Sequence, residues 1–137
     1  MLQAYPGLRG ILFDTADGLA QADRTLGNAG VGERCAIRVG DFLAAAPEGA
    51  ELHLLKSALQ DWDDDCAGTI LAHIRRVTPD DGRLLIIEPV LPEVVDASLP
   101  STMYLGDLTM LVNTGGRERT GQTSSSSARG PVSRCKR

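Results

Sequence analysis

The sequence predicts an α/β fold in which helices flank a parallel sheet. Four short apolar runs alternate with segments of helical periodicity, and each run ends in a polar or charged residue. This alternation is typical of parallel strands joined by helical crossovers. The expected strands are residues 10–14, 35–39, 52–56 and 84–88.

Two helices are expected among these strands. The first covers about residues 17–29 and ends near Gly30. The second follows three aspartates at 63–65, where acidic groups favour the positive end of a helix. Its apolar residues recur at spacings of three and four, which predicts one buried stripe, made of Ala67, Ile70, Leu71, Ile74 and Val77.

A third helix is expected from Ser101 to Asn113, ending at a glycine pair, Gly115 and Gly116. Spacings of three and four again suggest which residues face the core. The predicted inner face consists of Tyr104, Leu108, Leu111 and Val112.

The chain divides by composition into one domain and a tail. Residues 1–120 hold all 18 acidic residues and 10 of the 14 basic ones, a balance of −8 that would repel a phosphate backbone. With only five aromatic residues, base stacking is also poorly supplied, so no nucleic-acid partner is expected. Residues 121–137 are serine-rich and basic, and we expect them to be disordered because they can bury little apolar surface.

The cysteines and the apolar pattern bear on location. The three cysteines are widely spaced without a CxxC pair, so neither a metal site nor a disulfide framework is expected. No apolar run approaches the roughly 18 residues that a membrane helix needs, so no membrane partner is expected. The sequence therefore suggests a soluble, cytoplasmic protein.

Two strand ends carry carboxylates that suit a nucleoside. Asp14 could accept hydrogen bonds from both ribose hydroxyls, although a helix N-cap or turn is an equally good interpretation. Asp41 could bind the adenine amino group, and Phe42 could cover the ring. The alternative for this second pair is a strand-ending turn with Phe42 in the core.

The most specific string is LLKSALQDWDD, which runs from Leu54 to Asp64. It closely resembles the LLKxxLHDWDD signature of the plant, fungal and bacterial O-methyltransferases typified by the caffeic acid and acetylserotonin enzymes. Four further elements resemble that family in the same order. They are the strand end at Asp14 (FDLP type), the GDF string at 40–42 (GDFF), the E-x-x-L-P segment at 88–92 and the GGRERT turn at 115–120.

The resemblance implies an incomplete Rossmann-like class I methyltransferase sheet of about four parallel strands. The family's first strand, its glycine-rich loop, its C-terminal strands and its N-terminal dimerisation domain have no counterpart in this sequence. Because the first strand normally lies in the middle of the sheet, its absence would leave two strand edges unpaired. A homodimer is implied by the family, but the domain that forms it is missing.

The resemblance also implies S-adenosylmethionine as cofactor. Asp14 would hold the ribose, Asp41 and Phe42 the adenine, and Lys56 a polar group of the cofactor. Trp62 would pack against it.

Catalysis in the family uses a histidine just before the Asp-Trp pair, oriented by two glutamates. Here Gln60 occupies the base position, and Glu88 and Glu118 occupy the orienting positions. A glutamine amide can orient a hydroxyl but cannot take its proton, and losing general-base catalysis typically costs about two to four orders of magnitude in rate. His53 and His73 fall within a strand and a helix and are expected to be structural.

The implied reaction is methyl transfer to a hydroxyl of an aromatic or polyketide-like small molecule. The acceptor side would be formed by Met103, Asp107, Met110 and Asn113, although the methionines could equally fill the core.

Two other interpretations stay open. One is a noncatalytic remnant, or half of a split methyltransferase that needs a partner chain. The other is a dinucleotide oxidoreductase, which also uses an acidic residue like Asp14. That class does not explain Lys56, the Asp61–Trp62 pair and the turn at 115–118 together.

Overall fold

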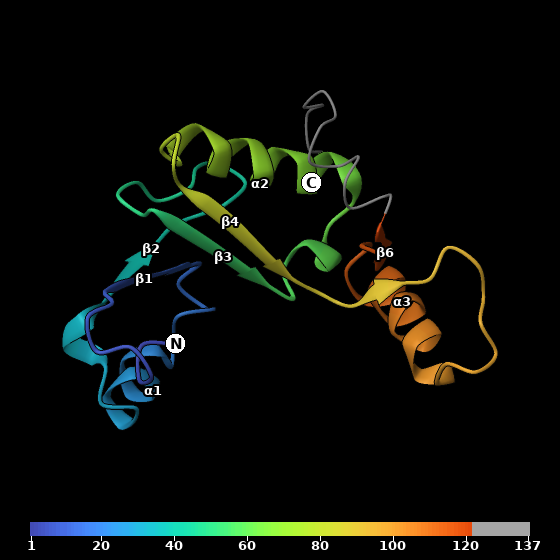
Figure 1. Cartoon of the computed structure of the whole chain (residues 1–137), viewed down its shortest axis with the longest axis horizontal. Coiled ribbons are helices and arrows are strands. Elements are labelled where there is room, and N and C mark those ends of the chain that lie inside the picture. Colours follow the sequence, from blue (N-terminus) through green and yellow to red (C-terminus); the bar gives the residue numbers. More distant parts are fainter. Residues whose placement is uncertain (122–137) are drawn as a thin grey trace.

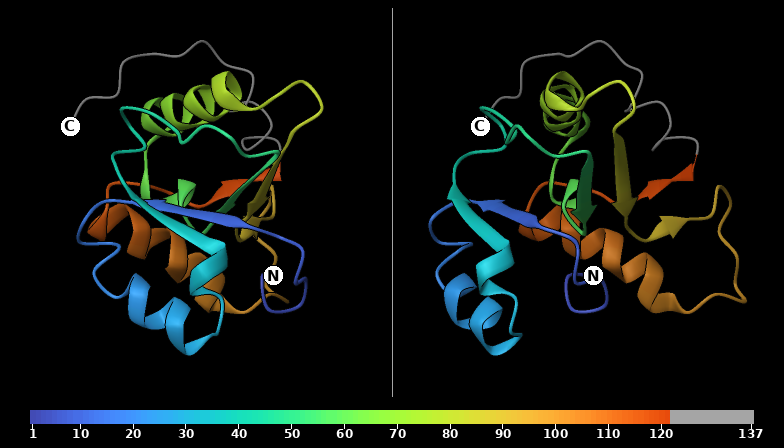
Figure 2. Two further views of the ribbon diagram at one scale, coloured as in Figure 1. Left: turned by 90° about the vertical axis from the view of Figure 1, so that its left-hand side faces the viewer. Right: turned by 60° about the vertical axis from the view of Figure 1, so that its left-hand side comes forward.

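The computed structural model describes residues 1–121 as an α/β arrangement of parallel strands with helices on both sides. Figures 1 and 2 show α2 on one side of the strands and α1 and α3 on the other. The predicted α/β class with parallel strands is therefore confirmed. The expected disordered tail, 121–137, lies outside the described residues except for Gly121.

All four predicted strands are present. β1 (Gly10–Asp14) and β2 (Cys35–Val39) pair in parallel, with Gly10 opposite Cys35 and Asp14 opposite Val39. β3 (Leu52–Lys56) pairs in parallel with β4 (Arg83–Ile87), with Lys56 opposite Ile87. Parallel register brings the carboxyl ends of paired strands to one edge, as the sequence suggested.

The strands do not join into one sheet. Within residues 1–121 they form three separate two-stranded sheets, β1–β2, β3–β4 and β5–β6. The last of these, β5 (Val90–Leu91) and β6 (Arg119–Thr120), was not predicted because a two-residue bridge has no periodicity to detect. Each of the four long strands consequently has one edge without a hydrogen-bonded neighbour, which agrees with the expectation of an open sheet.

The core lies between α2 (Asp64–Val77) and one face of β3–β4. Asp63 caps the helix, since its carboxylate accepts a hydrogen bond from the Cys66 amide at 2.8 Å. The predicted apolar stripe is buried in its first four members, Ala67, Ile70, Leu71 and Ile74, which form a cluster with Leu59.

The opposite face of β3–β4 is open. His53 and Leu55 point toward α2, so by alternation Leu52 and Leu54 point away, and they are 44% and 45% exposed. Leu85 and Ile87 on β4 are each 44% exposed on that same face. A strand that is apolar on both faces is typical of a sheet covered on both sides. Among residues 1–121, the face of β3–β4 toward α2 is covered by a helix, whereas the face with Leu54 and Leu85 stays partly exposed.

α1 (Ala22–Asn28) is shorter than predicted, because residues 16–21 form turns rather than a continuous helix. It packs near the short helix η1 (Gly32–Arg34), which was not predicted. The Arg34 guanidinium donates hydrogen bonds to the carbonyls of Leu2, Tyr5, Pro6 and Leu8, at 2.9 to 3.4 Å. One side chain thereby fastens the first residues of the chain to η1, just before β2.

α3 (Ser101–Asn113) has the predicted bounds, but its predicted inner face is wrong. Leu108, Leu111 and Val112 are 56%, 59% and 81% exposed. Of the four predicted residues only Tyr104 is partly buried, and the other partly buried positions are Met103, Gly106, Asp107 and Met110. Apolar spacing failed here because both sides of α3 carry large apolar residues, and the more polar side is the one that contacts the rest of the chain.

Among the described cysteines, Cys35 is free. Among residues 1–121, every helix is too short or too polar to cross a bilayer.

Candidate active site

The loop after β3 is built around Glu88. Ser57 leaves the strand with a φ of 51°, which turns the chain into the short helix η2 (Leu59–Asp61). Glu88, one residue beyond β4, reaches across, and its Oε1 accepts hydrogen bonds from the amides of Ala58 at 2.9 Å and Leu59 at 2.5 Å. These are amides that the start of a helix leaves without partners, so Glu88 fixes the position of the following residue, Gln60.

Arg119 fastens the glycine-pair turn to the same loop. Its guanidinium donates to the carbonyl oxygens of Leu59 at 2.8 Å and Trp62 at 3.0 Å, and to the carboxylate of Asp64. Arg119 is only 5% exposed, and this burial lowers its pKa, while Glu88 and Asp63 act in the opposite direction. Sequence reasoning gave Arg119 no role, because its partners Asp64 and Leu59 are 55 and 60 positions away in the chain.

Gly116 allows the turn to approach the loop closely. A Cβ placed on Gly116 would lie 2.1 Å from the carbonyl oxygen of Gln60 and 2.5 Å from the carbonyl carbon of Asp61. Both are backbone atoms that cannot rotate away. Glycine is therefore required at position 116 for the turn and η2 to pack together.

Gln60 and Glu118 are brought to one face of α3. Gln60 Nε2 donates to the sulfur of Met110 at 3.6 Å, whereas its Oε1 is buried without a hydrogen-bond partner among the described residues. Glu118 Oε2 is likewise buried without a hydrogen-bond partner among the described residues. The Glu118 amide donates to Asp107 Oδ1 at 2.9 Å, which ties residue 118 to the helix.

Burial and negative neighbours raise the pKa of two carboxyl groups in this region. For Glu118 the largest cause is burial, followed by the charges of Asp107 and Glu88. For Asp61 the causes are burial and then Glu88. Clusters of this kind are common in active sites, where a raised pKa moves a carboxyl group toward the range useful for proton transfer.

The four residues expected on the acceptor side divide into two groups. Met103, Asp107 and Met110 lie on the partly buried side of α3, where Asp107 and Met110 contact Glu118 and Gln60. Asn113 is exposed and is not brought to this cluster.

Asp14 and Asp41, which were expected to bind the nucleoside, lie at the carboxyl ends of β1 and β2. The Gly40 amide donates to the Asp14 carbonyl at 2.9 Å, which places Asp14 next to Asp41. The Asp14 carboxylate accepts from the Thr15 amide at 2.7 Å, as the turn interpretation required. Asp41 Oδ1 accepts from the Leu43 amide at 2.9 Å.

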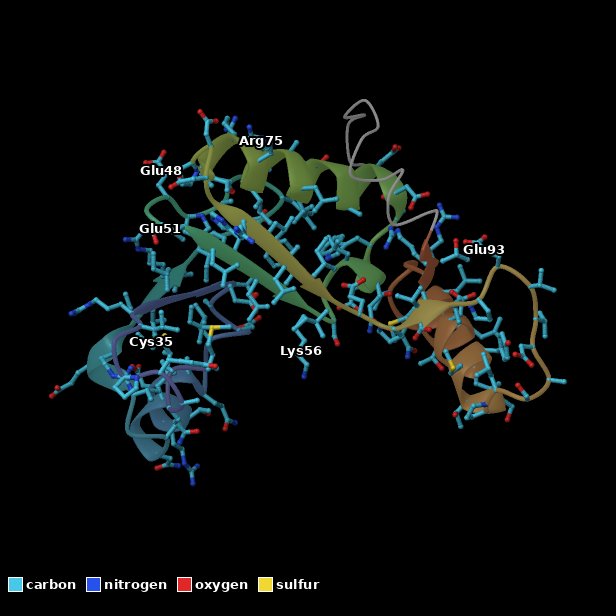
Figure 3. The ribbon with its side chains drawn as sticks, viewed as in Figure 1. Cys35, Glu48, Glu51, Lys56, Arg75 and Glu93 are labelled. Atoms are coloured by element: carbon cyan, nitrogen blue, oxygen red, sulfur yellow. The ribbon has the colours of Figure 1, made fainter. Side chains whose placement is uncertain are left out.

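Two aromatic residues connect this edge to the core. Phe42 and Trp62 meet edge to face, with ring centroids 5.7 Å apart and an interplanar angle of 80°. Both pack against the core cluster beneath α2, so the core interpretation of Phe42 holds in this structure. Lys56 stands at the carboxyl end of β3 and points away from α2 (Figure 3).

Both histidines have structural partners, as expected. His53 is buried, with Nδ1 at 3.1 Å from Thr78 Oγ1 and Nε2 at 3.4 Å from the Pro47 carbonyl. His73 Nε2 lies 3.2 Å from the Leu43 carbonyl. Neither is near Gln60 in the fold, so neither replaces a base there.

The donor set suits the adenosine part of the expected cofactor. Carboxylates at adjacent strand ends can accept hydrogen bonds from a ribose and an adenine amino group, and the site needs no metal for this. A separate cavity of about 160 Å³ lies between α2 and β4, with Glu88 and Arg119 among its lining residues. Its other lining residues are apolar, and they are Leu59, Ala67, Leu71, Ile86, Pro89 and Val90.

Comparison with known proteins points to the same family that the sequence motifs resemble. The sequence profile of a family described as the O-methyltransferase domain matches residues 1–129. The chain is 47% identical over 119 residues to O-demethylpuromycin-O-methyltransferase of Streptomyces alboniger, covering 87% of this chain and 32% of that protein. It is 38% identical over 116 residues to the acetylserotonin O-methyltransferase of Bos taurus, covering 85% of this chain and 33% of that protein.

Solved structures agree with the fold. The methyltransferase CalO6 superimposes with a TM-score of 0.85 at 41% identity, over 93% of this chain and 43% of that one. PigF, solved with SAH, superimposes with a TM-score of 0.84 at 33% identity, over 93% of this chain and 38% of that one. The chain spans about a third of the length of the curated relatives that it matches.

Proposed function

Because the chain belongs to the O-methyltransferase domain family, we propose that it contributes the adenosine-binding and acceptor-facing parts of an S-adenosylmethionine-dependent O-methyltransferase. The observation that carries the proposal is the convergence of Gln60, Glu88 and Glu118 on one loop, with Asp14 and Asp41 at adjacent strand ends. Relatives with the same domain include one structure solved with SAH and one solved with SAM.

The cofactor, when bound, supplies an electrophilic methyl group on a sulfonium sulfur. In this proposal Asp14 accepts hydrogen bonds from the ribose, and Asp41 accepts one from the adenine amino group. Phe42 and Trp62 pack against the core but are only partly buried, so in this proposal their remaining surface lies beside the adenosine. Lys56 projects from the end of β3, where it can reach a polar group of the cofactor.

The acceptor would be a small molecule with a hydroxyl group, aromatic or polyketide-like. Relatives include a mitomycin biosynthesis 6-O-methyltransferase and a phenazine O-methyltransferase. Met103 and Met110 offer polarisable apolar surface for a ring, and Asp107 and Gln60 offer polar contacts beside it. Asn113 is exposed and would contact only the outer rim of an acceptor.

Isothermal titration with S-adenosylmethionine and S-adenosylhomocysteine tests this proposal, with circular dichroism to establish folding. We expect saturable binding that Asp14→Ala weakens at least tenfold, because a ribose would lose a charged acceptor. Asp17→Ala, in the exposed turn nearby, is the matched control. Unchanged affinity in Asp14→Ala would contradict the ribose role.

A second candidate function is that of one half of a methyltransferase that needs another polypeptide segment. The observation that favours it is the pair of parallel two-stranded sheets, β1–β2 and β3–β4, which share no hydrogen bonds. A further parallel strand could pair with both, and a helix following it could cover Leu54 and Leu85.

This candidate predicts that the chain alone binds S-adenosylhomocysteine weakly and that a complementing segment restores binding. Coexpression with the preceding segment of a relative, such as the Streptomyces alboniger enzyme, supplies that strand. Copurification together with tighter binding would support complementation. Equal binding with and without the segment would exclude it.

A further inference from the structure

The segment that joins β2 to β3, residues 40–51, is fastened to α2 by His73. The Nε2 atom of His73 lies 3.2 Å from the carbonyl oxygen of Leu43. Figures 1 and 2 show the segment passing beside α2. The same segment carries Asp41 and Phe42, which the proposed function assigns to the adenine of the cofactor. A contact that fixes Leu43 therefore bears on the adenosine site.

The hydrogen bonds around His73 determine which ring nitrogen carries its proton. Arg76 Nη2 lies 3.1 Å from His73 Nδ1, and a guanidinium has only N–H donors, so Nδ1 accepts this bond. The neutral ring then carries its proton on Nε2, which donates it to the Leu43 carbonyl. Arg76, on the next turn of α2, thereby selects the tautomer of His73 that can hold the segment.

Leu43 is hydrogen-bonded on both sides of its backbone. Its carbonyl oxygen accepts from His73, whereas its amide donates to Asp41 Oδ1 at 2.9 Å. The amides of Ala44 and Ala45 donate to the Asp41 carbonyl at 2.9 and 3.0 Å, which closes one compact turn. The orientation of the Asp41 carboxylate consequently depends on the same residue that His73 holds.

The other histidine holds the far end of the segment. His53 Nε2 lies 3.4 Å from the carbonyl oxygen of Pro47. His53 is buried within β3, so replacing it would disturb the sheet together with the segment. His73 is only partly buried on α2, and its ring can be replaced with less damage to the core. The contribution of the segment to binding can therefore be tested at His73.

We propose that His73 is a positioning residue for the adenosine site and that it acts by orienting Asp41 through Leu43. This inference rests on the proposed methyltransferase function, and it makes recognition of the adenine amino group the property that His73 controls. A carboxylate held in one orientation accepts a directed hydrogen bond from that amino group, whereas a poorly positioned one distinguishes less between purines. Loss of His73 should therefore change which purine is preferred as well as how tightly the chain binds.

Titration calorimetry with S-adenosylhomocysteine and S-inosylhomocysteine measures this preference. In the second ligand a carbonyl oxygen replaces the purine amino group, so Asp41 faces an acceptor instead of a donor. For the wild type we expect the adenosine ligand to bind at least about tenfold more tightly. His73→Leu should lower this ratio to about threefold or less, whereas His73→Gln should restore most of it, because its Nε2 can still donate to Leu43. Arg75→Leu, at an exposed position of the same helix, is the matched control and should keep the wild-type ratio.

A double-mutant cycle separates positioning from a general loss of stability. In the Asp41→Ala background, His73→Leu should change the ratio of the two affinities no further, because the carboxylate that His73 orients is gone. The inference is overturned if His73→Leu keeps the wild-type ratio. It is also overturned if His73→Leu lowers the ratio equally with and without the Asp41 side chain.

Amide hydrogen exchange of the chain without ligand tests the same contact separately from cofactor binding. His73→Leu should speed exchange at Leu43 and Ala44, and His73→Gln should retain most of their protection. Unchanged exchange in His73→Leu would contradict the positioning role. A wild type that binds neither ligand would instead contradict the proposed function, and exchange at Leu43 would still decide whether His73 holds the turn.

Discussion

Arg119 donates two hydrogen bonds to a single carboxylate oxygen of Asp64, from Nε at 3.1 Å and from Nη2 at 3.0 Å. The two residues are 55 positions apart in the sequence. The contact joins the turn that carries Glu118 to the first turn of α2. Arg119 therefore helps to position Gln60 and Glu118, although its guanidinium donates no hydrogen bond to either side chain.

Removing the Arg119 side chain should strongly destabilise the chain. In Arg119→Ala the carbonyls of Leu59 and Trp62 and the carboxylate of Asp64 lose a buried donor, which we expect to cost about 3 kcal/mol or more. Arg117→Ala is the control, because Arg117 also pairs with Asp64 but is half exposed, and its loss should cost about 1 kcal/mol or less. Urea unfolding followed by circular dichroism measures both, and similar losses for the two variants would contradict the assignment.

Gly116→Ala should also destabilise the chain, because its Cβ would overlap the backbone of η2. We expect a loss of about 1–3 kcal/mol and displacement of the turn. Gly68→Ala makes the same chemical change within α2, where nothing lies within 4 Å of the new Cβ. That variant should gain about 0.5–1 kcal/mol from helix propensity. Relative to the wild type, the melting temperature should therefore fall for Gly116→Ala and rise for Gly68→Ala.

The bond between Glu88 and the start of η2 can be tested by amide hydrogen exchange. Glu88→Ala leaves the amides of Ala58 and Leu59 without their acceptor and should cost about 1–3 kcal/mol. Both amides should exchange faster. Glu88→Gln keeps an acceptor oxygen and should retain most of their protection, so equal exchange in the two variants would argue against this cap.

Stability should depend on pH through Glu118. Its folded-state pKa is raised by burial, Asp107 and Glu88, so folding disfavours the ionised form. The group therefore lowers stability above its folded pKa, and this penalty disappears as the pH falls below the unfolded value of about 4.3. Glu118→Gln should be more stable than the wild type at pH 7, by about 1 kcal/mol at most because the side chain is only partly buried. At about pH 4, urea unfolding should give the same free energy of unfolding for the two proteins. A difference that is the same at every pH would show that the charge of Glu118 does not cause it.

Gln60→His introduces a group that titrates near neutral pH at the base position. In a chain that binds cofactor, we expect methyl transfer to catechol to rise about tenfold or more, with loss of the gain below about pH 6.5. Chromatographic detection of methylated catechol measures the rate, and Gln60→Ala is the control. A folded, cofactor-binding variant without any gain would show that the base does not limit the rate.

Much of the fold could be predicted from the sequence, because strand and helix patterns are local. The runs at 10–14, 35–39 and 52–56 formed strands at those residues, and α3 begins and ends where expected. Non-local pairing could not be predicted in the same way. The bridge between β5 and β6 joins Val90 to Arg119, and no short window of sequence contains both.

The candidate site was predicted in part. The motif placed Gln60, Glu88 and Glu118 in one region, and their contacts support that placement. Neither the contacts of Arg119 nor the approach of Gly116 to η2 could be predicted, because both depend on distances between segments that are far apart in the chain. The inner face of α3 was misjudged because apolar spacing does not reveal which side of a helix has a neighbour.

The division into two-stranded sheets has a consequence for cooperativity. A domain unfolds in a single transition when its parts share one continuous network of contacts, whereas weakly joined parts open separately. Here the β1–β2 part with α1 and the β3–β4 part with α2 share no strand ladder. Calorimetry of the chain should give a van't Hoff enthalpy below the calorimetric one, with β1–β2 melting as an independent unit.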